Sequence, residues 1–350
     1  MISHETYIKR CIELAKNGLG TTYPNPLVGS VIVHNGKIIG EGWHRKSGES
    51  HAEVIAIDSV KNKELLKEST IYVSLEPCSH FGKTPPCADL IIQHKIPRVV
   101  IGTIDPFAKV CGSGIAKLKK SGIKVEVGFL ENECRELNKR FFTFHQKKRP
   151  YIILKWAQTQ NGFIAPLQKK ETKPVWISNE FSRQLVHKWR AEEQAIMVGT
   201  NTVLQDNPRL DIRSWTGENP IRIVLDRELK ITSGFSVYNK SVKTIFITEK
   251  ERLSEHENQV FEKIDFNKNV NIGILDVLYK HQIQSVIVEG GAVLLESFIK
   301  NDLWDEARVF TSDLSFEKGI KAPEFNTNKA AIKNDISDNT LEYFYHTTEK

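Results

Sequence analysis

The spacing of hydrophobic and polar residues in the first half of the chain predicts helices that alternate with buried strands. After Ser3, a residue type favoured just before a helix, apolar residues recur at helical spacing as far as Asn17-Gly18. Residues 28–33 and 37–43 predict the strands of a hairpin, because the Asn35-Gly36 pair between them suits the positive φ angles of a tight turn. Further strands are predicted at 70–75, 98–103 and 124–129, and further helices at 51–60, from Pro85 onwards, at 114–120 and at 131–145.

The basic segment 147–150, which ends in proline, predicts a boundary between two domains, 1–146 and 147–350. A chain of 350 residues fits two domains of ordinary size, about 150 residues each. A second alternating series follows the boundary, and the polar segment 318–340 is assigned no element. Strands are predicted at 151–157, 195–198, 221–225, 244–248, 285–288 and 306–310, and helices after Ser178 and at 292–300. Strands that alternate with helices predict an α/β fold in both domains.

The composition excludes several classes of protein. Hydrophobic residues make up 40% and charged residues 26%, which is ordinary for a globular chain and unlike a disordered, collagen-like or coiled-coil sequence. No apolar run approaches the roughly 20 residues that cross a bilayer, and the N-terminus lacks the basic and apolar regions of a signal peptide. We therefore expect a cytoplasmic protein with no membrane partner.

The net charge of +6 comes from mostly scattered basic residues, so we expect no nucleic-acid partner, and an anionic small-molecule substrate would suit this charge equally well. Whether the chain forms a homo-oligomer stays open. All five cysteines lie in the first half, and their small, odd number argues against a disulfide framework.

Two of the cysteines belong to a pattern that predicts a zinc site. His51-Ala52-Glu53 is followed by Glu76-Pro77-Cys78 and then by Pro85-Pro86-Cys87. One imidazole and two thiolates supply three tetrahedral ligands and leave a fourth position for water, which is the arrangement of catalytic zinc. We predict that His51, Cys78 and Cys87 bind one zinc ion per chain and that Glu53, which is not needed as a ligand, moves a proton. The remaining three are predicted to be ordinary small apolar residues: Cys11, Cys111 and Cys134.

The pattern is close to the signature of zinc deaminases, His-x-Glu followed by Pro-Cys-x-x-Cys. It departs from that signature because eight residues, 79–86, separate the two cysteines. Two rival interpretations remain open at this point. A deaminase of tRNA or DNA bases would share the zinc site but would need a basic, aromatic-lined path for the strand. A non-catalytic scaffold with structural zinc would need a fourth protein ligand, for which His80 is the nearby candidate.

Motifs in both halves resemble the bifunctional deaminase–reductases of riboflavin biosynthesis. In the first half they are Pro24-Asn25-Pro26-Leu27-Val28-Gly29, His51-Ala52-Glu53 and the segment from Glu76 to Cys87, whose long spacer belongs to the family pattern. In the second half they are Lys155-Trp156-Ala157, Trp176-Ile177-Ser178, Arg190-Ala191, residues 199–208, residues 222–226 and Val288-Glu289-Gly290-Gly291. The resemblance implies a cytidine-deaminase-like N-terminal domain and a dihydrofolate-reductase-like C-terminal domain.

The resemblance also implies two activities and assigns residues to them. The N-terminal domain would deaminate a phosphorylated diaminopyrimidinone ribosylamine by zinc-dependent hydrolysis, with Glu53 as proton donor and Asn25 against the pyrimidine ring. The C-terminal domain would use NADPH to reduce the ribosyl group to ribityl. Matching positions imply cofactor contacts from Ala157, Trp176, Thr202, Asp206, Gly291, Ala292, Val293, Leu294, Leu295, Glu296 and Ser297, and substrate contacts from Arg190, Leu210, Arg213 and Glu289.

Elementary chemistry agrees with the reductase assignment. A strand that ends in Glu289-Gly290-Gly291 before a helix presents backbone N–H groups and a positive dipole end to a phosphate. Arginine binds phosphate through two parallel hydrogen bonds. Two positions depart from the family pattern: Asn161-Gly162 stands where Asp-Gly is common, and Pro174 replaces a substrate-contacting serine and cannot donate a hydrogen bond.

Overall fold

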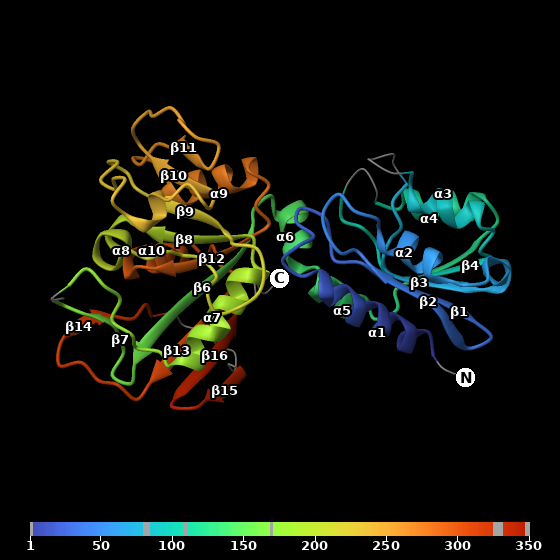
Figure 1. The fold of residues 1–350 in the computed structure, drawn as a ribbon, viewed down its shortest axis with the longest axis horizontal. Helices are drawn as coiled ribbons and strands as arrows, with labels where there is room; N and C mark the ends of the chain where they lie inside the picture. The colour runs from blue at the N-terminus through green and yellow to red at the C-terminus, as the bar shows by residue number, and fades with distance from the viewer. Residues whose placement is uncertain (1–2, 80–84, 108–110, 169–170, 325–331, 347–350) are drawn as a thin grey trace. The chain divides into compact units, whose positions relative to one another are not determined.

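The computed structural model describes residues 3–79, 85–107, 111–168, 171–324 and 332–346. The chain divides into two compact units, Met1–Lys148 and Arg149–Lys350 (Figure 1). Each unit contains a large sheet with hydrophobic clusters of its own. Within the described ranges, no helix is long and apolar enough to cross a membrane.

The N-terminal unit is built on a five-stranded sheet in the order β2-β1-β3-β4-β5. Strand β1 pairs antiparallel with β2 and β3, and β3, β4 and β5 run parallel. The predicted hairpin is confirmed, since Asn35 and Gly36 have φ angles of 48° and 75° between its two strands. The strands are β1 (Gly29–His34), β2 (Lys37–Trp43), β3 (Thr70–Leu75), β4 (Arg98–Thr103) and β5 (Lys124–Val127).

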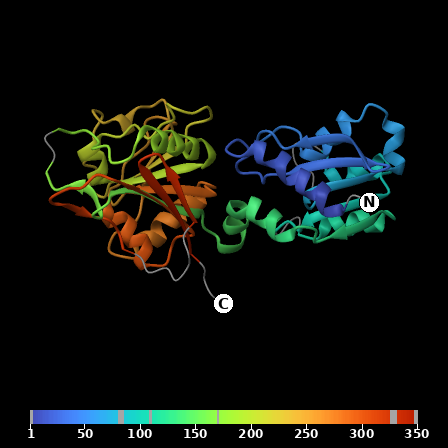
Figure 2. The same cartoon turned by 90° about the horizontal axis from the view of Figure 1, so that it is seen from below.

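Helices cover both faces of this sheet (Figures 1 and 2). Successive strand residues point to opposite faces, so Ile71 and Val73 pack against α2, α3 and α4, while Tyr72 and Val100 pack against α1 and α5. The helices are α1 (His4–Ala15), α2 (Ala52–Ser59), α3 (Cys87–Gln93), α4 (Ser113–Lys120), α5 (Glu131–Leu137) and α6 (Lys139–Lys147). This arrangement places the first residues of α2 and α3 near the carboxyl end of β3.

The C-terminal unit is built on a nine-stranded sheet in the order β11-β10-β9-β8-β12-β6-β13-β16-β15. The strands from β11 to β13 in this order run parallel, and β16 and β15 continue the sheet as antiparallel strands. The strands are β6 (Tyr151–Thr159), β8 (Ala195–Gly199), β9 (Ile221–Leu225), β10 (Thr244–Thr248), β11 (Gln259–Lys263), β12 (Ser285–Gly290), β13 (Glu306–Ser312), β15 (Ile332–Ile336) and β16 (Asn339–Tyr345). A separate two-stranded sheet pairs β7 (Phe163–Pro166) with β14 (Gly319–Lys321).

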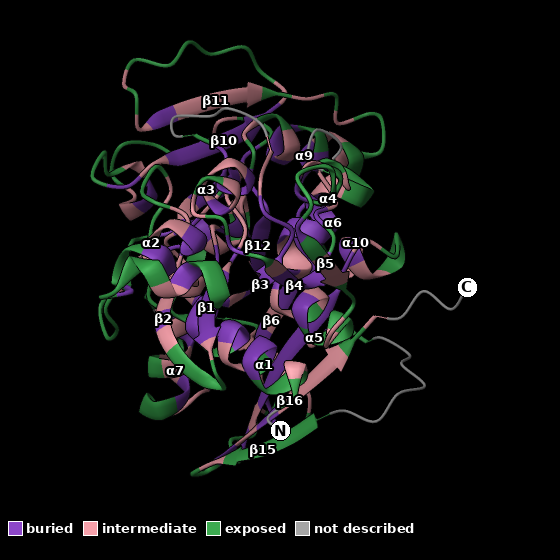
Figure 3. Ribbon diagram, turned by 90° about the vertical axis from the view of Figure 1, so that its right-hand side faces the viewer, coloured by how far each residue is buried: buried purple, intermediate pink, exposed green. Residues whose placement is uncertain are grey.

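Four helices pack on the two faces of the nine-stranded sheet. Helices α9 and α10 share a core with Leu154, Met197 and Val288, whereas α7 and α8 pack on the opposite face, against Ile153 and Val198. The central strands of both sheets are mostly buried (Figure 3). The helices are α7 (Glu180–Glu192), α8 (Thr200–Asp206), α9 (Val270–Lys280) and α10 (Ala292–Lys300).

The structure differs from the predicted elements at several places, and β7, β11, α8 and α9 form where no element was predicted. The helix predicted at 131–145 is divided at Asn138, whose buried side chain donates to the carbonyl oxygen of Leu27 and accepts from its N–H, both at 2.8 Å. Within the segment 318–340, where no element was predicted, β14, β15 and the start of β16 form. Most side chains of β15 are exposed, so its sequence shows no alternation of apolar and polar residues. It is a strand because it pairs with β16.

Candidate functional site

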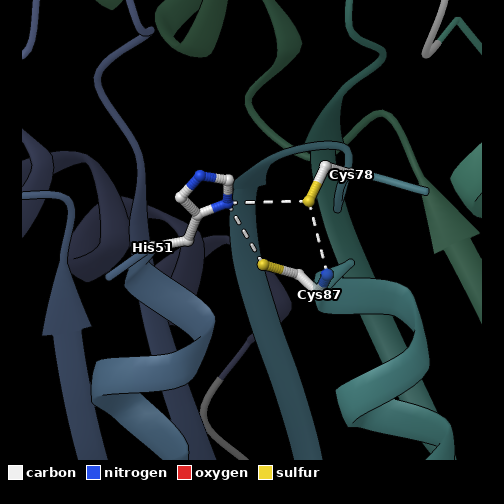
Figure 4. Close-up of side chains that lie close together, drawn as sticks. All are labelled: His51, Cys78 and Cys87. Carbon is white, nitrogen blue, oxygen red and sulfur yellow. Dashed lines mark hydrogen bonds between the residues drawn. The ribbon is translucent and has the colours of Figure 1, made fainter. Parts of the chain in front are cut away.

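The three predicted zinc ligands converge from three separate elements. His51 is the residue before α2, Cys78 follows β3, and Cys87 is the first residue of α3. His51 Nδ1 lies 3.6 Å from Cys78 Sγ and 3.3 Å from Cys87 Sγ (Figure 4). The three ligand atoms lie within 4.8 Å of one another, and no other such group occurs in the described part of the chain.

This spacing fits tetrahedral zinc. Zn–S bonds of about 2.3 Å and Zn–N bonds of about 2.0 Å place neighbouring ligand atoms about 3.5 to 3.8 Å apart. The two nitrogen–sulfur distances, 3.6 Å and 3.3 Å, fall near that range. One imidazole and two thiols are also the ligand types that zinc prefers. The donor set therefore fits the ion in both chemistry and geometry.

The protonation of the triad favours a thiolate at Cys78. Hydrogen bonds from the Cys87 thiol and from His51 lower the pKa of Cys78, and the same pairing, together with burial, raises the pKa of Cys87. The hydrogen bond to Cys78 raises the pKa of His51 to about 9. The N–H of Cys87, at the start of α3, also donates to Cys78 Sγ at 3.3 Å. Zinc would replace the protons that these three groups share.

Glu53 lies in the first turn of α2, two residues after His51, and is 3% exposed. Burial raises the pKa of its carboxyl group to about 7. A carboxyl group with a pKa near the working pH can both accept and release a proton. Glu53 therefore has the location and the acidity of a proton shuttle next to the metal ligands.

The loop that carries Cys78 is fixed by the residue at its start, Glu76, which is 4% exposed. Its Oε1 accepts the N–H groups of Gly114 at 2.9 Å and Ile115 at 3.2 Å. Its Oε2 accepts those of Gly112 at 2.9 Å and Asp105 at 3.4 Å. The buried carboxylate thus caps the N-terminus of α4 and ties the metal-binding loop to it.

Asn25, predicted to contact the pyrimidine ring, is connected to the metal ligands through His44. Asn25 Nδ2 lies 3.0 Å from His44 Nε2, and His44 Nδ1 lies 3.1 Å from the carbonyl oxygen of Ser50. The rings of His44 and His51 meet edge to face, with centroids 5.4 Å apart. The sequence analysis did not identify His44 as a site residue, because it stands alone after β2 and belongs to none of the motifs.

The other cysteines do not share one environment. Cys11 and Cys134 are buried in a hydrophobic cluster, which suits the prediction of small apolar residues, whereas Cys111 is exposed. Cys111 directly precedes Gly112, the cap of α4, and belongs to none of the hydrophobic clusters in the described part of the chain. His80, the candidate fourth ligand of a structural zinc site, lies outside the described residues.

In the C-terminal unit the predicted substrate residues form one connected group. Arg190 on α7 and Glu289 on β12 form a bidentate ion pair, with Nη2–Oε2 at 2.9 Å and Nε–Oε1 at 3.3 Å. Nη1 of Arg190 donates to the carbonyl oxygen of Asp211 at 3.1 Å, between Leu210 and Arg213. Lys155 on β6 is half-buried near this pair, and desolvation lowers the pKa of its amine. Lys155 belongs to a sequence motif but was not predicted to be a site residue.

The predicted cofactor residues lie on neighbouring elements, with different exposure. Gly291 caps the N-terminus of α10, and a Cβ on it would lie 3.3 Å from Thr202 Oγ1, so α8 and α10 adjoin there. Leu294 and Leu295 are buried in the core, which leaves only their backbone for a ligand, while Val293 is 81% exposed. Trp176 is 56% exposed beneath the Arg183 guanidinium. The remaining positions are Ala157 on β6, Asp206 at the end of α8, and Ala292, Glu296 and Ser297 on α10.

Comparisons with known proteins match both units. Residues 1–103 match the model of the cytidine and deoxycytidylate deaminase zinc-binding region, and residues 150–313 match that of the RibD C-terminal domain. The riboflavin biosynthesis protein RibD of Aquifex aeolicus is 44% identical over 324 residues, which cover 90% of this chain and 88% of the relative. The protein of the same name from Escherichia coli is 36% identical over 323 residues, 87% of this chain and 86% of the relative.

A solved structure extends the similarity to the whole fold. The crystal structure of a diaminohydroxyphosphoribosylaminopyrimidine deaminase/5-amino-6-(5-phosphoribosylamino)uracil reductase from Thermotoga maritima superposes with a TM-score of 0.85. It is 38% identical, and the match covers 98% of each chain.

Fold and site together define a two-part enzyme, in which a zinc-dependent pyrimidine deaminase precedes an NADPH-dependent reductase. The chain belongs to the RibD family of bifunctional riboflavin-biosynthesis enzymes. The predicted family, the two fold classes, the enzymatic nature and the two cofactors are thereby confirmed. The match of the second unit to a reductase domain supports this interpretation over a nucleic-acid deaminase or a structural-zinc scaffold.

Proposed function

We propose that the chain catalyses two consecutive steps on one phosphorylated pyrimidine. The first is hydrolytic deamination of 2,5-diamino-6-ribosylamino-4(3H)-pyrimidinone 5′-phosphate by residues 1–146. The second is reduction of the ribosyl side chain of the product to ribityl by residues 147–350. The observation that carries the first step is the His51–Cys78–Cys87 triad with the buried carboxyl group of Glu53 beside it. The ion pair of Arg190 with Glu289 on the strand before Gly291 supports the second.

In the deaminase site, His51, Cys78 and Cys87 hold the zinc ion. A zinc ion held there would supply Lewis-acid activation of water at neutral pH. Glu53 takes the proton from the attacking water and delivers it to the amine that leaves as ammonia. Its burial and its raised pKa of about 7 support that exchange. Asn25, held by His44, positions the pyrimidine ring with its side-chain amide.

In the reductase site, NADPH supplies the hydride for the anomeric carbon of the sugar. Backbone N–H groups at the start of α10, from Gly291 onwards, bind a cofactor phosphate, aided by the helix dipole. Arg213 is the better placed arginine for the substrate phosphate, because its side chain is 38% exposed. Arg190 is 11% exposed and is engaged by Glu289, so this pair orders the site and contacts the sugar. Leu210 supports the same loop from the core.

We also propose that the partners of the chain are its small-molecule substrate and further copies of itself in a homo-oligomer. The free thiols at the metal site favour a reducing compartment, and we propose the cytoplasm.

The test is an assay of both reactions with the pathway intermediate. Ammonia release and NADPH oxidation are measured in the same sample of the full chain loaded with zinc. We expect one ammonia released and one NADPH oxidised per substrate molecule consumed. Ammonia release with no NADPH oxidation would overturn the reductase half, and loss of both would overturn the proposal.

A further inference from the structure

Helix α7 presents two polar side chains, one turn apart, to the loop that carries Leu210 and Arg213. His187 and Arg190 are three residues apart and therefore lie on the same face of the helix. Arg190 Nη1 donates to the carbonyl oxygen of Asp211 at 3.1 Å. His187 Nδ1 accepts the backbone N–H of Arg213 at 3.2 Å. The helix thus holds the loop at two backbone positions on either side of Ile212.

The loop needs such attachments because its backbone is not in a relaxed conformation. Asn207 and Leu210 have φ angles of 41° and 53°, in the left-handed region that non-glycine residues rarely adopt. The Leu210 side chain is 2% exposed and packs in a hydrophobic cluster, and the N–H of Ile212 donates to Asn219 Oδ1 at 2.7 Å. The hydrogen bond to His187 is therefore the contact that fixes the backbone at Arg213 itself.

The chemistry of the imidazole suits an acceptor role. His187 is 6% exposed, and burial, followed by the charges of Arg190 and Arg213, lowers its pKa to about 4, against the opposing effect of Asp211 and Glu289. At neutral pH the ring is uncharged, and its proton lies on Nε2 because Nδ1 accepts from Arg213. A protonated ring would have no acceptor for that N–H.

We propose that His187 is a positioning residue of the reductase site, which fixes the backbone of Arg213 so that its guanidinium meets the substrate phosphate. This inference rests on the proposed function, in which Arg213 contacts the substrate. The guanidinium of Arg213 is paired with the Asp211 carboxylate. With its backbone fixed, the Arg213 guanidinium can reach both the Asp211 carboxylate and the substrate phosphate. The phosphate then replaces the carboxylate as the partner of the guanidinium when substrate binds.

The test compares two replacements of His187 that differ in where they place an acceptor. In His187→Asn the side-chain oxygen lies near the position of Nδ1, whereas in His187→Gln it lies near that of Nε2. For His187→Gln we expect the KM for the deaminated intermediate to rise about three- to tenfold, as loss of one hydrogen bond implies. The kcat and the KM for NADPH should stay within about twofold of those of the parent enzyme. His187→Asn should restore most of the substrate KM.

A double-mutant cycle separates positioning from a general structural effect. In an Arg213→Ala background, His187→Gln should change the substrate KM no further, because the residue that it positions is gone. His281→Gln provides a matched control, since His281 pairs with Glu262 on another part of the unit, and its kinetics should equal those of the parent enzyme.

The outcomes distinguish this inference from the proposed function. If the parent enzyme does not oxidise NADPH with the deaminated intermediate, the proposed function itself fails. If the parent is active, an unchanged KM in His187→Gln would overturn the positioning role. A KM effect of His187→Gln that persists undiminished without Arg213 would overturn it as well.

Discussion

Single side chains decide the chemistry of the metal site. A catalytic zinc ion takes three donor atoms from the protein, and His51, Cys78 and Cys87 bring theirs to within 4.8 Å of one another. The carboxyl group of Glu53 lies in the first turn of α2, which His51 immediately precedes, but it is not a member of that triad. This separation supports the proposal that Glu53 moves protons while the three other residues hold the ion.

Substitution of Glu53 by glutamine separates the proton shuttle from metal binding. Glutamine keeps the size of the side chain but cannot carry a proton from water to the leaving amine. We expect Glu53→Gln to keep its zinc, measured by elemental analysis, and to deaminate at least about a hundredfold more slowly. Near-normal ammonia release by this variant would show that another group moves the proton.

Substitution of either ligand thiol by a hydroxyl should remove the metal. A neutral serine oxygen is a poor substitute for thiolate on zinc, so Cys78→Ser and Cys87→Ser should each lose most of the bound ion. Cys111→Ser is the matched control, because this exposed cysteine lies outside the triad. Zinc content per chain is the measurement, and full occupancy in Cys87→Ser would mean that the ligand set is wrongly assigned.

At the scale of elements, the N-terminus of α4 holds the metal-binding loop through Glu76. The four N–H groups that its carboxylate accepts include that of Gly114, where a Cβ would lie 2.1 Å from the carbonyl oxygen of Pro77. The close approach explains why glycine occupies that position, and it leaves the backbone before Cys78 little room to move. The geometry of Cys78 thus depends on a helix far along the chain, since Gly114 lies 36 positions after Cys78.

Loss of this attachment should weaken zinc binding. In Glu76→Gln an amide N–H₂ replaces one acceptor oxygen and faces N–H donors, so hydrogen bonds are lost without a change in size. We expect zinc affinity, measured by competition with a chelator, to fall about tenfold or more, as for other residues that support metal ligands. Glu64→Gln is the control, because Glu64 is exposed and pairs only with Lys67 among the described contacts of its side chain. Equal affinities in the two variants would contradict the attachment.

The sequence predicted best the helices and strands whose formation depends on residues that are neighbours in the chain. The hairpin at Asn35-Gly36 follows from turn chemistry, and strands β3 and β4 follow from short runs rich in β-branched and apolar residues. The division of 131–145 at Asn138 could not be predicted, because its cause is a pair of hydrogen bonds to Leu27, more than a hundred residues away. Strand β15 has mostly exposed side chains, so its existence depends on β16 and not on its own pattern.

The sequence predicted those residues of the candidate site that belong to short sequence motifs. The His51, Cys78 and Cys87 triad follows from residue types and spacing, and the structure brings the three together. His44 and His187 could not be found in this way. Each acts on a distant segment, His44 on the Asn25 side chain and His187 on the backbone at Arg213, and only the folded chain brings them together.

At the scale of the whole molecule, the two chemistries have separate requirements. Every proposed metal ligand lies in the unit Met1–Lys148, and the proposed NADPH and sugar contacts lie in Arg149–Lys350, which has its own sheet and core. Hydride transfer from NADPH needs no zinc. We therefore infer that the metal serves only the first reaction.

Removal of zinc from the full chain tests that claim most directly, with NADPH oxidation measured on two substrates. After treatment with a chelator, the enzyme should oxidise NADPH at an undiminished rate when it is given the already deaminated intermediate. With the undeaminated substrate, ammonia release should stop, and NADPH oxidation should stop with it for lack of substrate. Readdition of zinc should restore both. Loss of NADPH oxidation with the deaminated intermediate, or continued ammonia release without metal, would contradict the account.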